Sequence, residues 1–231
     1  MELAAATWNE VDATGRRCVL AVPVGSLEQH GPHLPLDTDT RVAVALVRAL
    51  GRRQDDIVVA PAIAYGASGE HADFPGTLLM GHRVLADLVL ELVRSARSAF
   101  RGVVIVSAHG GNRHALDLAE ESCAADDEEV LFWSARTPGG DAHAGRTETS
   151  LLLAIDPAAV RLDLAAPGCT EPLERIMPRL RAEGVRPISS NGVLGDPAGA
   201  NASEGEQLIA ALTDELAAAV TARWPPEVTA P

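Results

Sequence analysis

Four short apolar segments, each separated from the next by a helical pattern, constrain the fold of this chain more than any other feature. The segment at residues 103–106 is wholly apolar and β-branched, which is typical of a strand buried on both faces of a parallel sheet. Alternating strands and helices predict a layered α/β fold with a mostly parallel central sheet flanked by helices. The predicted strands are residues 17–24, 57–63, 103–106 and 130–133.

The length and the uninterrupted pattern of elements predict a single domain covering residues 1–231. In the last predicted helix, Ser203 and Glu206 resemble a capping box. Residues 225–231 are expected to form a flexible tail. The predicted helices are residues 40–50, 83–100, 112–124, 147–155, 171–183 and 203–224.

Composition argues against several classes of function. The formal net charge is −13 and the basic residues are scattered, so we expect no nucleic-acid partner. All 19 basic residues are arginine, which excludes a Schiff-base lysine and a P-loop lysine. No apolar run approaches the ~20 residues of a membrane span. The first residues lack the features of a signal peptide, so we expect a cytoplasmic protein without a membrane partner.

Residues 28–39 gather two histidines and three carboxylates directly after the first predicted strand. Imidazole and carboxylate together suit zinc, iron or manganese. Glu28 and His30 are two positions apart on an extended segment and therefore share a face, while Asp39 opens the next helix. We expect His33 to orient a ligand. Asp37 is either a ligand, a hydrogen-bond partner of a ligand or a turn residue.

Three more polar segments follow the other predicted strands, at residues 68–77, 107–112 and 141–150. Because the carboxyl ends of parallel strands meet at one edge of a sheet, we expect these segments to converge with the first. His109 at a strand end and Glu148 in the first turn of a helix complete a set of two imidazoles and three carboxylates. Such a set can hold two cations about 3.5–4 Å apart and activate water for hydrolysis.

Three motifs of this chain resemble the signature of the creatininase family, namely residues 22–35 with Asp39, residues 109–112 and residues 143–150. The resemblance implies a layered α/β fold, a centre of two divalent metal ions and hydrolysis of amide C–N bonds. Its metal-ligand motifs fall on five positions, with Asp39 as the expected bridge: Glu28, His30, Asp39, His109 and Glu148.

One departure from the family pattern follows His109. Creatinine amidohydrolases carry a tyrosine and a glutamate directly after this histidine, whereas this chain has Gly110 and Gly111. The glutamate ligand must then come from elsewhere, and Glu148 is the candidate. The same departure argues against creatinine as the substrate.

Within the family, residues 68–77, 141–145 and 191–197 resemble the members that cleave a ribosomal precursor peptide after its modification by a radical-SAM enzyme. The resemblance implies a cut near the C-terminus, which releases a small core built from a terminal Val-Tyr pair, and a homo-oligomer such as a hexamer. One alternative is another amidohydrolase of the family, acting on creatinine or on a formamidopyrimidine. Another is a non-catalytic metal-binding scaffold, against which the intact set of five ligands argues.

The remaining polar residues take expected roles in this chemistry. His143 is expected to transfer a proton to the leaving amine, because imidazole both accepts and donates near neutral pH. Glu148 is expected to serve in catalysis as well as in metal binding. Glu70, His71 and Asn112 are expected to bind the substrate, although the segment around Glu70 equally fits a polar turn.

Overall fold

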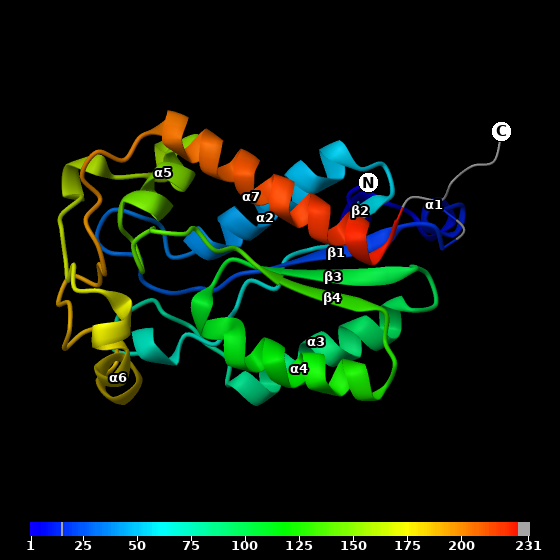
Figure 1. Cartoon of the computed structure of the whole chain (residues 1–231), viewed down its shortest axis with the longest axis horizontal. Helices are drawn as coiled ribbons and strands as arrows, with labels where there is room; N and C mark the ends of the chain where they lie inside the picture. The colour runs from blue at the N-terminus through cyan, green and yellow to red at the C-terminus, as the bar shows by residue number, and fades with distance from the viewer. Residues whose placement is uncertain (15, 226–231) are drawn as a thin grey trace.

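A parallel sheet of buried strands forms the centre of the structure (Figure 1). The computed structural model describes residues 1–14 and 16–225, so the tail predicted at 225–231 lies outside the described residues, apart from Pro225. Within the described residues, the sheet has four parallel strands in the order β2-β1-β3-β4. They are β1 (Val19–Val24), β2 (Ile57–Val59), β3 (Gly102–Ser107) and β4 (Val130–Ser134). The predicted α/β fold with a parallel central sheet is confirmed.

Two layers of helices cover the sheet, one above and one below it in Figure 1. Every residue of β1 and β3 is buried, which requires cover on both faces. The upper layer contains α2 (Thr38–Arg53), α5 (Arg146–Ile155) and α7 (Ala202–Arg223). The lower layer contains α3 (His82–Ala96) and α4 (Arg113–Ala125).

An apolar core lies between the sheet and each layer, and alternate residues of one strand serve the two cores. Val19 of β1 belongs to the core that contains Leu46 of α2. Leu20, the next residue, belongs to the core that contains Leu85 of α3. Full burial of a leucine side chain stabilises a fold by about 1.5–3 kcal/mol relative to exposure. The strands are common to both cores, so the layers are held around one sheet.

The remaining elements are short helices and single helical turns. The α-helices are α1 (Trp8–Asp12) and α6 (Leu173–Glu183). The 3-10 turns are η1 (Leu3–Ala5), η2 (Gly69–His71), η3 (Gly110–Asn112), η4 (Pro157–Ala159) and η5 (Leu162–Leu164).

The prediction for the second strand was too long. β2 ends at Val59, and Pro61 follows two residues later without the N–H that would extend the ladder. Ile63 keeps only an isolated parallel bridge to Val24.

The capping box predicted for the last helix is wrong. α7 begins one residue earlier, at Ala202, and its cap is Asn201, whose side-chain oxygen accepts a hydrogen bond from the N–H of Glu204 at 3.0 Å. Ser203 is therefore the second residue of the helix rather than its cap.

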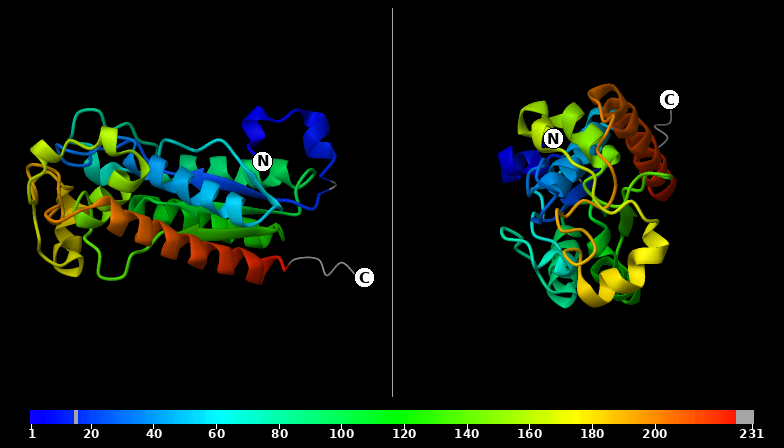
Figure 2. Two further views of the ribbon diagram at one scale, coloured as in Figure 1. Left: turned by 90° about the horizontal axis from the view of Figure 1, so that it is seen from above. Right: turned by 90° about the vertical axis from the view of Figure 1, so that its left-hand side faces the viewer.

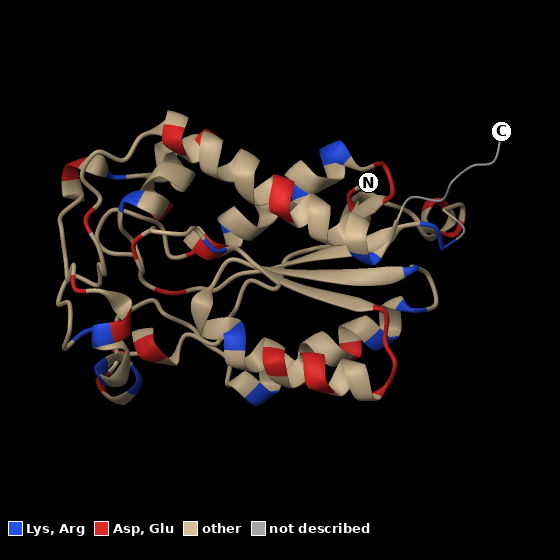
Figure 3. Ribbon diagram, viewed as in Figure 1, with Lys and Arg blue, Asp and Glu red and all other residues tan. Residues whose placement is uncertain are grey.

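The carboxyl ends of the strands all lie at the left of Figure 1, where the longest loops and α6 gather, and the view from above in Figure 2 agrees. The predicted convergence of the four polar segments follows from this parallel arrangement. Figure 3 shows acidic and basic residues interspersed along the outer helices. One such pair is Arg146 with Glu204, at 2.9 Å. None of the described helices is both long and apolar enough to cross a membrane.

Candidate metal centre

Polar side chains from several loops and two helices meet at the carboxyl end of the sheet. The segment after β1 supplies Glu28 and His30, and the first turn of α2 supplies Asp39. His109 lies just beyond the end of β3, and Glu148 lies in the first turn of α5. All of these side chains are buried except that of Glu148, which is 22% exposed. The structure therefore brings the five predicted ligands together.

Asp39 lies between two groups of these residues. Its Oδ2 atom is 3.1 Å from Nδ1 of His109, whose Nε2 is 3.1 Å from Oε2 of Glu28. Its Oδ1 atom is 3.2 Å from Nε2 of His30, and that nitrogen is 3.8 Å from Oε2 of Glu148. One oxygen of Asp39 faces each group, an arrangement that would suit a carboxylate shared by two cations.

The side-chain atoms of the cluster would be better satisfied by bound cations than they are by one another. Both carboxylate oxygens of Glu28 are buried, and neither accepts a hydrogen bond from any of the described residues. His30 donates from Nδ1 to the carbonyl oxygen of Glu28 at 3.1 Å. A neutral His30 ring would then turn the lone pair of Nε2 toward an acceptor oxygen of Asp39. A proton or a cation between those two atoms removes the conflict, and a backbone carbonyl behind the ring is the usual support of a metal-binding histidine.

The electrostatics of the cluster show the same demand for positive charge. Burial raises the pKa of Glu28 to about 7 and that of Glu148 to about 7. Burial opposes the charged forms of His30 and His109, but the surrounding carboxylates raise the pKa of each ring to about 10. Burial also opposes ionisation of Asp39, yet the cationic His30 and His109 hold its pKa well below the usual value. Without cations, protons on the two rings balance the carboxylates.

The two predicted supporting residues lie in different places. His33 is buried, and its Nε2 is 2.9 Å from Oγ1 of Thr149, the neighbour of Glu148. It can therefore hold the first turn of α5 against the loop. Asp37 lies outside the cluster, because its carboxylate is 39% exposed and pairs with Arg41 at 2.7 Å.

Asn112 has a different task from the substrate binding that the sequence suggested. Its side chain is fully buried and ties three backbone segments together. Oδ1 accepts from the N–H of Ala67 at 2.8 Å, and Nδ2 donates to the carbonyl of Gly25 at 3.0 Å. Since both ends of the amide are engaged with the backbone, Asn112 holds the loops that carry the cluster rather than facing a substrate.

Glu70 and His71 border the cluster on another side. His71 is buried, with Nε2 at 3.3 Å from Oε1 of Glu28. Glu70 is a quarter exposed, and its Oε1 is 3.9 Å from Nε2 of His109. A Cβ built at Gly111 would lie 2.6 Å from Oε1 of Glu70. Because Gly111 has no side chain, there is space beside His109 for the carboxylate of Glu70, which comes from η2.

His143 follows β4 and is fixed by its backbone as well as by its ring. It forms an isolated antiparallel bridge with Leu194, which brings the distant segment around Leu194 to the site. The next residue, Ala144, adopts a left-handed φ of 52° although it is not glycine, a conformation that costs of order 1–3 kcal/mol. The N–H of Ala144 donates to Oε2 of Glu148 at 2.6 Å. Burial and the nearby His30 hold the pKa of His143 well below its usual value.

The sequence prediction missed Ser26 and Gln29. Ser26 donates from Oγ to Oδ2 of Asp39 at 2.7 Å. The side chain of Gln29 contacts His71 and His143. Ser26 lies two positions before Glu28, and Gln29 lies directly after it. The partner of Ser26 is 13 residues further on, in α2, and the partners of Gln29 are far away in the sequence, so no local pattern indicates these contacts.

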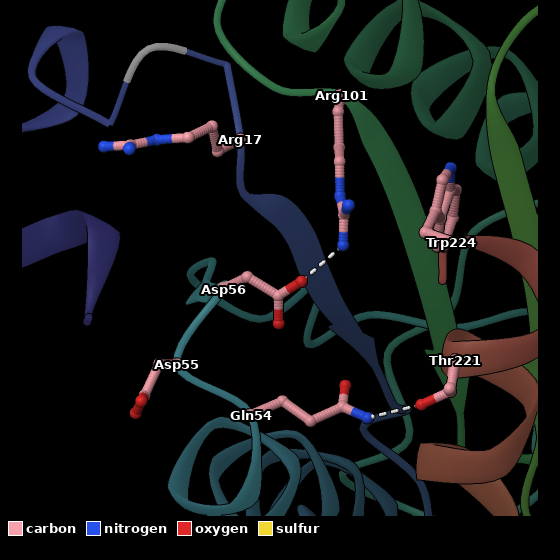
Figure 4. A pocket seen from close by; sticks show the side chains of 7 residues that line it. All are labelled: Arg17, Gln54, Asp55, Asp56, Arg101, Thr221 and Trp224. Atoms are coloured by element: carbon pink, nitrogen blue, oxygen red, sulfur yellow. Dashed lines mark hydrogen bonds and ion pairs between the residues drawn. The ribbon is translucent and has the colours of Figure 1, made fainter. Parts of the chain in front are cut away.

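A separate pocket lies at the opposite end of the sheet (Figure 4). Residues that precede β1, β2 and β3 line it together with the end of α7. Arg101 pairs with Asp56, and Gln54 donates to Oγ1 of Thr221 at 2.9 Å. This pocket contains none of the predicted site residues.

Comparison with known proteins connects the cluster to a family. The family model described as creatinine amidohydrolase matches residues 4–220. The mycofactocin precursor peptide peptidase of Mycobacterium tuberculosis (strain CDC 1551 / Oshkosh) is 44% identical over 235 residues, covering 98% of this chain and 92% of its own length. The protein of the same name from Mycolicibacterium smegmatis is 46% identical over 214 residues, covering 90% and 86%.

Solved creatininase structures share the fold. A mutant creatininase of the Zn-Zn type has a TM-score of 0.80 and 27% identity, covering 97% of this chain and 98% of that one. A structure called creatininase Mn has a TM-score of 0.79 and 26% identity, covering 97% and 99%. On the family match and on these relatives, the chain belongs to the creatininase family of hydrolases that act on amide bonds.

Proposed function

We propose that this chain is a metal-dependent peptidase that cleaves the modified mycofactocin precursor peptide near its C-terminus and releases the core derived from its Val-Tyr pair. The observation that carries the metal-dependent hydrolysis is the position of Asp39, with one carboxylate oxygen toward each group of ligands. The choice of a peptide substrate is supported by the 44–46% identity to mycofactocin precursor peptide peptidases over nearly the whole chain.

Two divalent ions are the cofactors we propose. Glu28, Asp39 and His109, whose ligand atoms lie within 4.8 Å of one another, would hold one. His30 would hold the other together with Asp39 and Glu148, whose oxygens lie 3.2 and 3.8 Å from its Nε2. When bound, such a pair activates water and polarises the carbonyl of the scissile amide. Zinc and manganese are supported by the names of the structural neighbours, and the same donor set also suits iron.

His143 is the residue we propose for proton transfer to the leaving amine. Its ring lies 4.4 Å from that of His30, measured between centroids, and its Nδ1 is 3.8 Å from Oε1 of Glu28. The lowered pKa leaves the ring neutral, and a neutral imidazole has one unprotonated nitrogen that could take up the proton before giving it to the amine. Glu148 would assist from the partly exposed side of the cluster, where the substrate has access.

Glu70 and His71 would form the substrate side of the site. The carboxylate of Glu70 is the more exposed of the two side chains and can accept an N–H of a bound peptide. We further propose a single domain and a cytoplasmic homo-oligomer. The single domain is supported by the strands, whose side chains belong to both apolar cores. The homo-oligomer is supported by exposed apolar residues such as Leu78 and Leu162, which offer a contact surface for a second copy.

The decisive experiment is a cleavage assay with the modified precursor peptide, read by mass spectrometry, with metal content measured on the same sample. We expect one cut near the C-terminus, loss of cleavage after chelation and recovery when zinc or manganese is added. Creatinine and a formamidopyrimidine serve as competing substrates. Turnover of either in preference to the peptide would replace the proposed substrate, and full cleavage by metal-free protein would refute the metal dependence.

The scaffold alternative makes a different prediction in the same assay. A non-catalytic scaffold would bind metal and leave all three substrates intact. Replacing His143 with glutamine offers a further control, because the proposed enzyme should keep its metal and lose turnover. Normal turnover by His143→Gln would remove this residue from the proton-transfer step.

A further inference from the structure

A buried glutamine lies among the histidines of the site, between two of the predicted ligands in sequence. The side-chain Nε2 of Gln29 is 2.9 Å from Nδ1 of His71 and 3.0 Å from Nε2 of His143. The same nitrogen is 3.0 Å from the carbonyl oxygen of Gly192. Oε1 of Gln29 accepts from the N–H of Gly31 at 2.9 Å. This amide therefore joins segments separated by more than a hundred residues.

The direction of each of these hydrogen bonds follows from partners that have only one role. The N–H of Gly31 can only donate and the carbonyl of Gly192 can only accept, which fixes both ends of the Gln29 amide. The backbone carbonyl of Gln29 lies 2.8 Å from Nε2 of His143, so this ring nitrogen carries a proton and donates it. The two amide hydrogens of Gln29 then go to Gly192 and to Nδ1 of His71, which must accept.

We propose that Gln29 is a positioning residue of the enzyme. Its side-chain amide holds His71, and its backbone carbonyl holds His143, in the same Nε2-protonated tautomer, while the two rings turn opposite ring atoms toward Glu28. His71 presents its Nε2–H to Oε1 of Glu28, at 3.3 Å. His143 presents the unprotonated Nδ1 to the same oxygen, at 3.8 Å.

The two histidines thereby receive different tasks. In this tautomer His71 turns a protonated nitrogen, and no lone pair, toward Glu28, at 3.3 Å and without completing a hydrogen bond, so it is not placed to accept a proton from the cluster. The unprotonated Nδ1 of His143 faces the cluster and can receive a proton. This part of the inference rests on the proposed function, since it is the peptidase reaction in which His143 would pass that proton to the leaving amine.

Gly192 provides a remote way to test the role of Gln29. Its backbone has a φ of +83°, and a Cβ at this position would collide with the side-chain amide of Gln29. Gly199 has nearly the same conformation, with a φ of +80°, but a Cβ there would meet only Arg146, at 3.3 Å. Gly192→Ala and Gly199→Ala are therefore matched for backbone strain and differ in whether they displace Gln29.

The first experiment locates the ring protons without using activity. Histidine side-chain ¹⁵N NMR is recorded on the full chain, metal-free and zinc-loaded, with signals assigned through His71→Gln and His143→Gln. We expect the proton on Nε2 in both rings of the wild type and of Gly199→Ala, and loss of the fixed His71 tautomer in Gly192→Ala and Gln29→Met. A proton on Nδ1 of either ring in the wild type overturns the inference.

The second experiment measures kcat, KM and metal content with the modified precursor peptide. Loss of a residue that orients a catalytic group lowers activity about 10- to 100-fold. We expect this fall in kcat for Gln29→Met and Gly192→Ala, with KM and metal content near wild type, and no change for Gly199→Ala. Wild-type kcat in a folded Gln29→Met protein overturns the positioning role. If the wild type leaves the peptide intact, the proposed function fails, while the tautomers remain measurable by NMR.

Discussion

At the scale of single residues, the proposed chemistry depends most on Asp39. It is buried, it faces both groups of ligands, and its Oδ2 also accepts a hydrogen bond from Ser26. Glu28 shows the complementary feature, a buried carboxylate whose oxygens accept no hydrogen bond from the described residues. Burying such a group is costly unless a charge compensates it, so Glu28 supports the proposed cations.

Replacing Asp39 with asparagine should remove the bridge and lower the affinity for both metals by more than about 100-fold, since loss of an outer partner alone costs about 10- to 100-fold. Asp37→Asn is the matched control, because Asp37 pairs with Arg41 away from the cluster. Metal titration of the metal-free proteins measures both. Wild-type affinity in Asp39→Asn would argue against the bridge.

The variant Ser26→Ala tests the hydrogen bond that Ser26 donates to Asp39. Without the hydroxyl, Oδ2 of Asp39 loses a hydrogen bond of 2.7 Å, and we expect metal affinity to fall about 10- to 100-fold with the fold intact. Ser95→Ala serves as the control, because Ser95 is exposed on α3 and donates only to the carbonyl of Leu92. The same titration applies, and equal affinities in the two variants would contradict the expectation.

At the scale of elements, two helices present carboxylates from their first turns. Asp39 opens α2 and Glu148 opens α5, where the positive end of the helix dipole favours negative charge. Asp141 holds the start of α5 by accepting from the N–H groups of Arg146 and Thr147, at 2.6 and 2.9 Å. Helix starts thus place two of the proposed ligands more precisely than loops alone would.

A prediction about the start of α7 tests whether Asn201 or Ser203 caps the helix. Asn201→Ala removes the side-chain acceptor for the N–H of Glu204, and we expect the free energy of unfolding to fall by about 1 kcal/mol. Ser203→Ala should change it by less than about 0.5 kcal/mol, because Ser203 is an exposed residue within the helix. Denaturant unfolding measures both, and the reverse order would restore Ser203 as the cap.

At the scale of the whole molecule, the cluster joins residues from Glu28 to Glu148 and concentrates charge at one end of the sheet. In the metal-free protein the carboxylates raise the pKa values of His30 and His109 to about 10. The folded state therefore holds protons that the unfolded chain releases near pH 6.5, the usual pKa of histidine. This contribution to stability is complete below about pH 6.5 and is lost as pH rises toward 10.

The stability of the metal-free protein should accordingly fall between pH 7 and about pH 9, as measured by its Tm in the presence of a chelator. Bound manganese should make the Tm depend less on pH, because metal ligation replaces the ring protons. His82→Gln is the control, since His82 is exposed at the start of α3. A Tm that rises over this range in the chelated protein would contradict the expectation.

Local patterns in the chain predicted the positions of the strands and of most helices, and they singled out the side chains that the structure brings together at the end of the sheet. Strand 103–106 is apolar throughout because it is buried on both faces, and the i, i+2 spacing of Glu28 and His30 follows from extended backbone. The helix cap at Asn201 and the early end of β2 were missed, because both depend on single residues at a boundary. Asn112 was misjudged, because its backbone partners come from other loops.

The chain order alone fixed an α/β fold, since buried β-branched segments that alternate with amphipathic helices can satisfy their backbone and bury their apolar faces in few other ways. It also supplied the histidines and carboxylates that we propose as ligands. Only the tertiary structure decided which oxygen of Asp39 faces which histidine, and that Gln29 reaches both His71 and His143. Such contacts join residues far apart in the chain, and hydrogen-bond direction depends on atomic positions that no local pattern specifies.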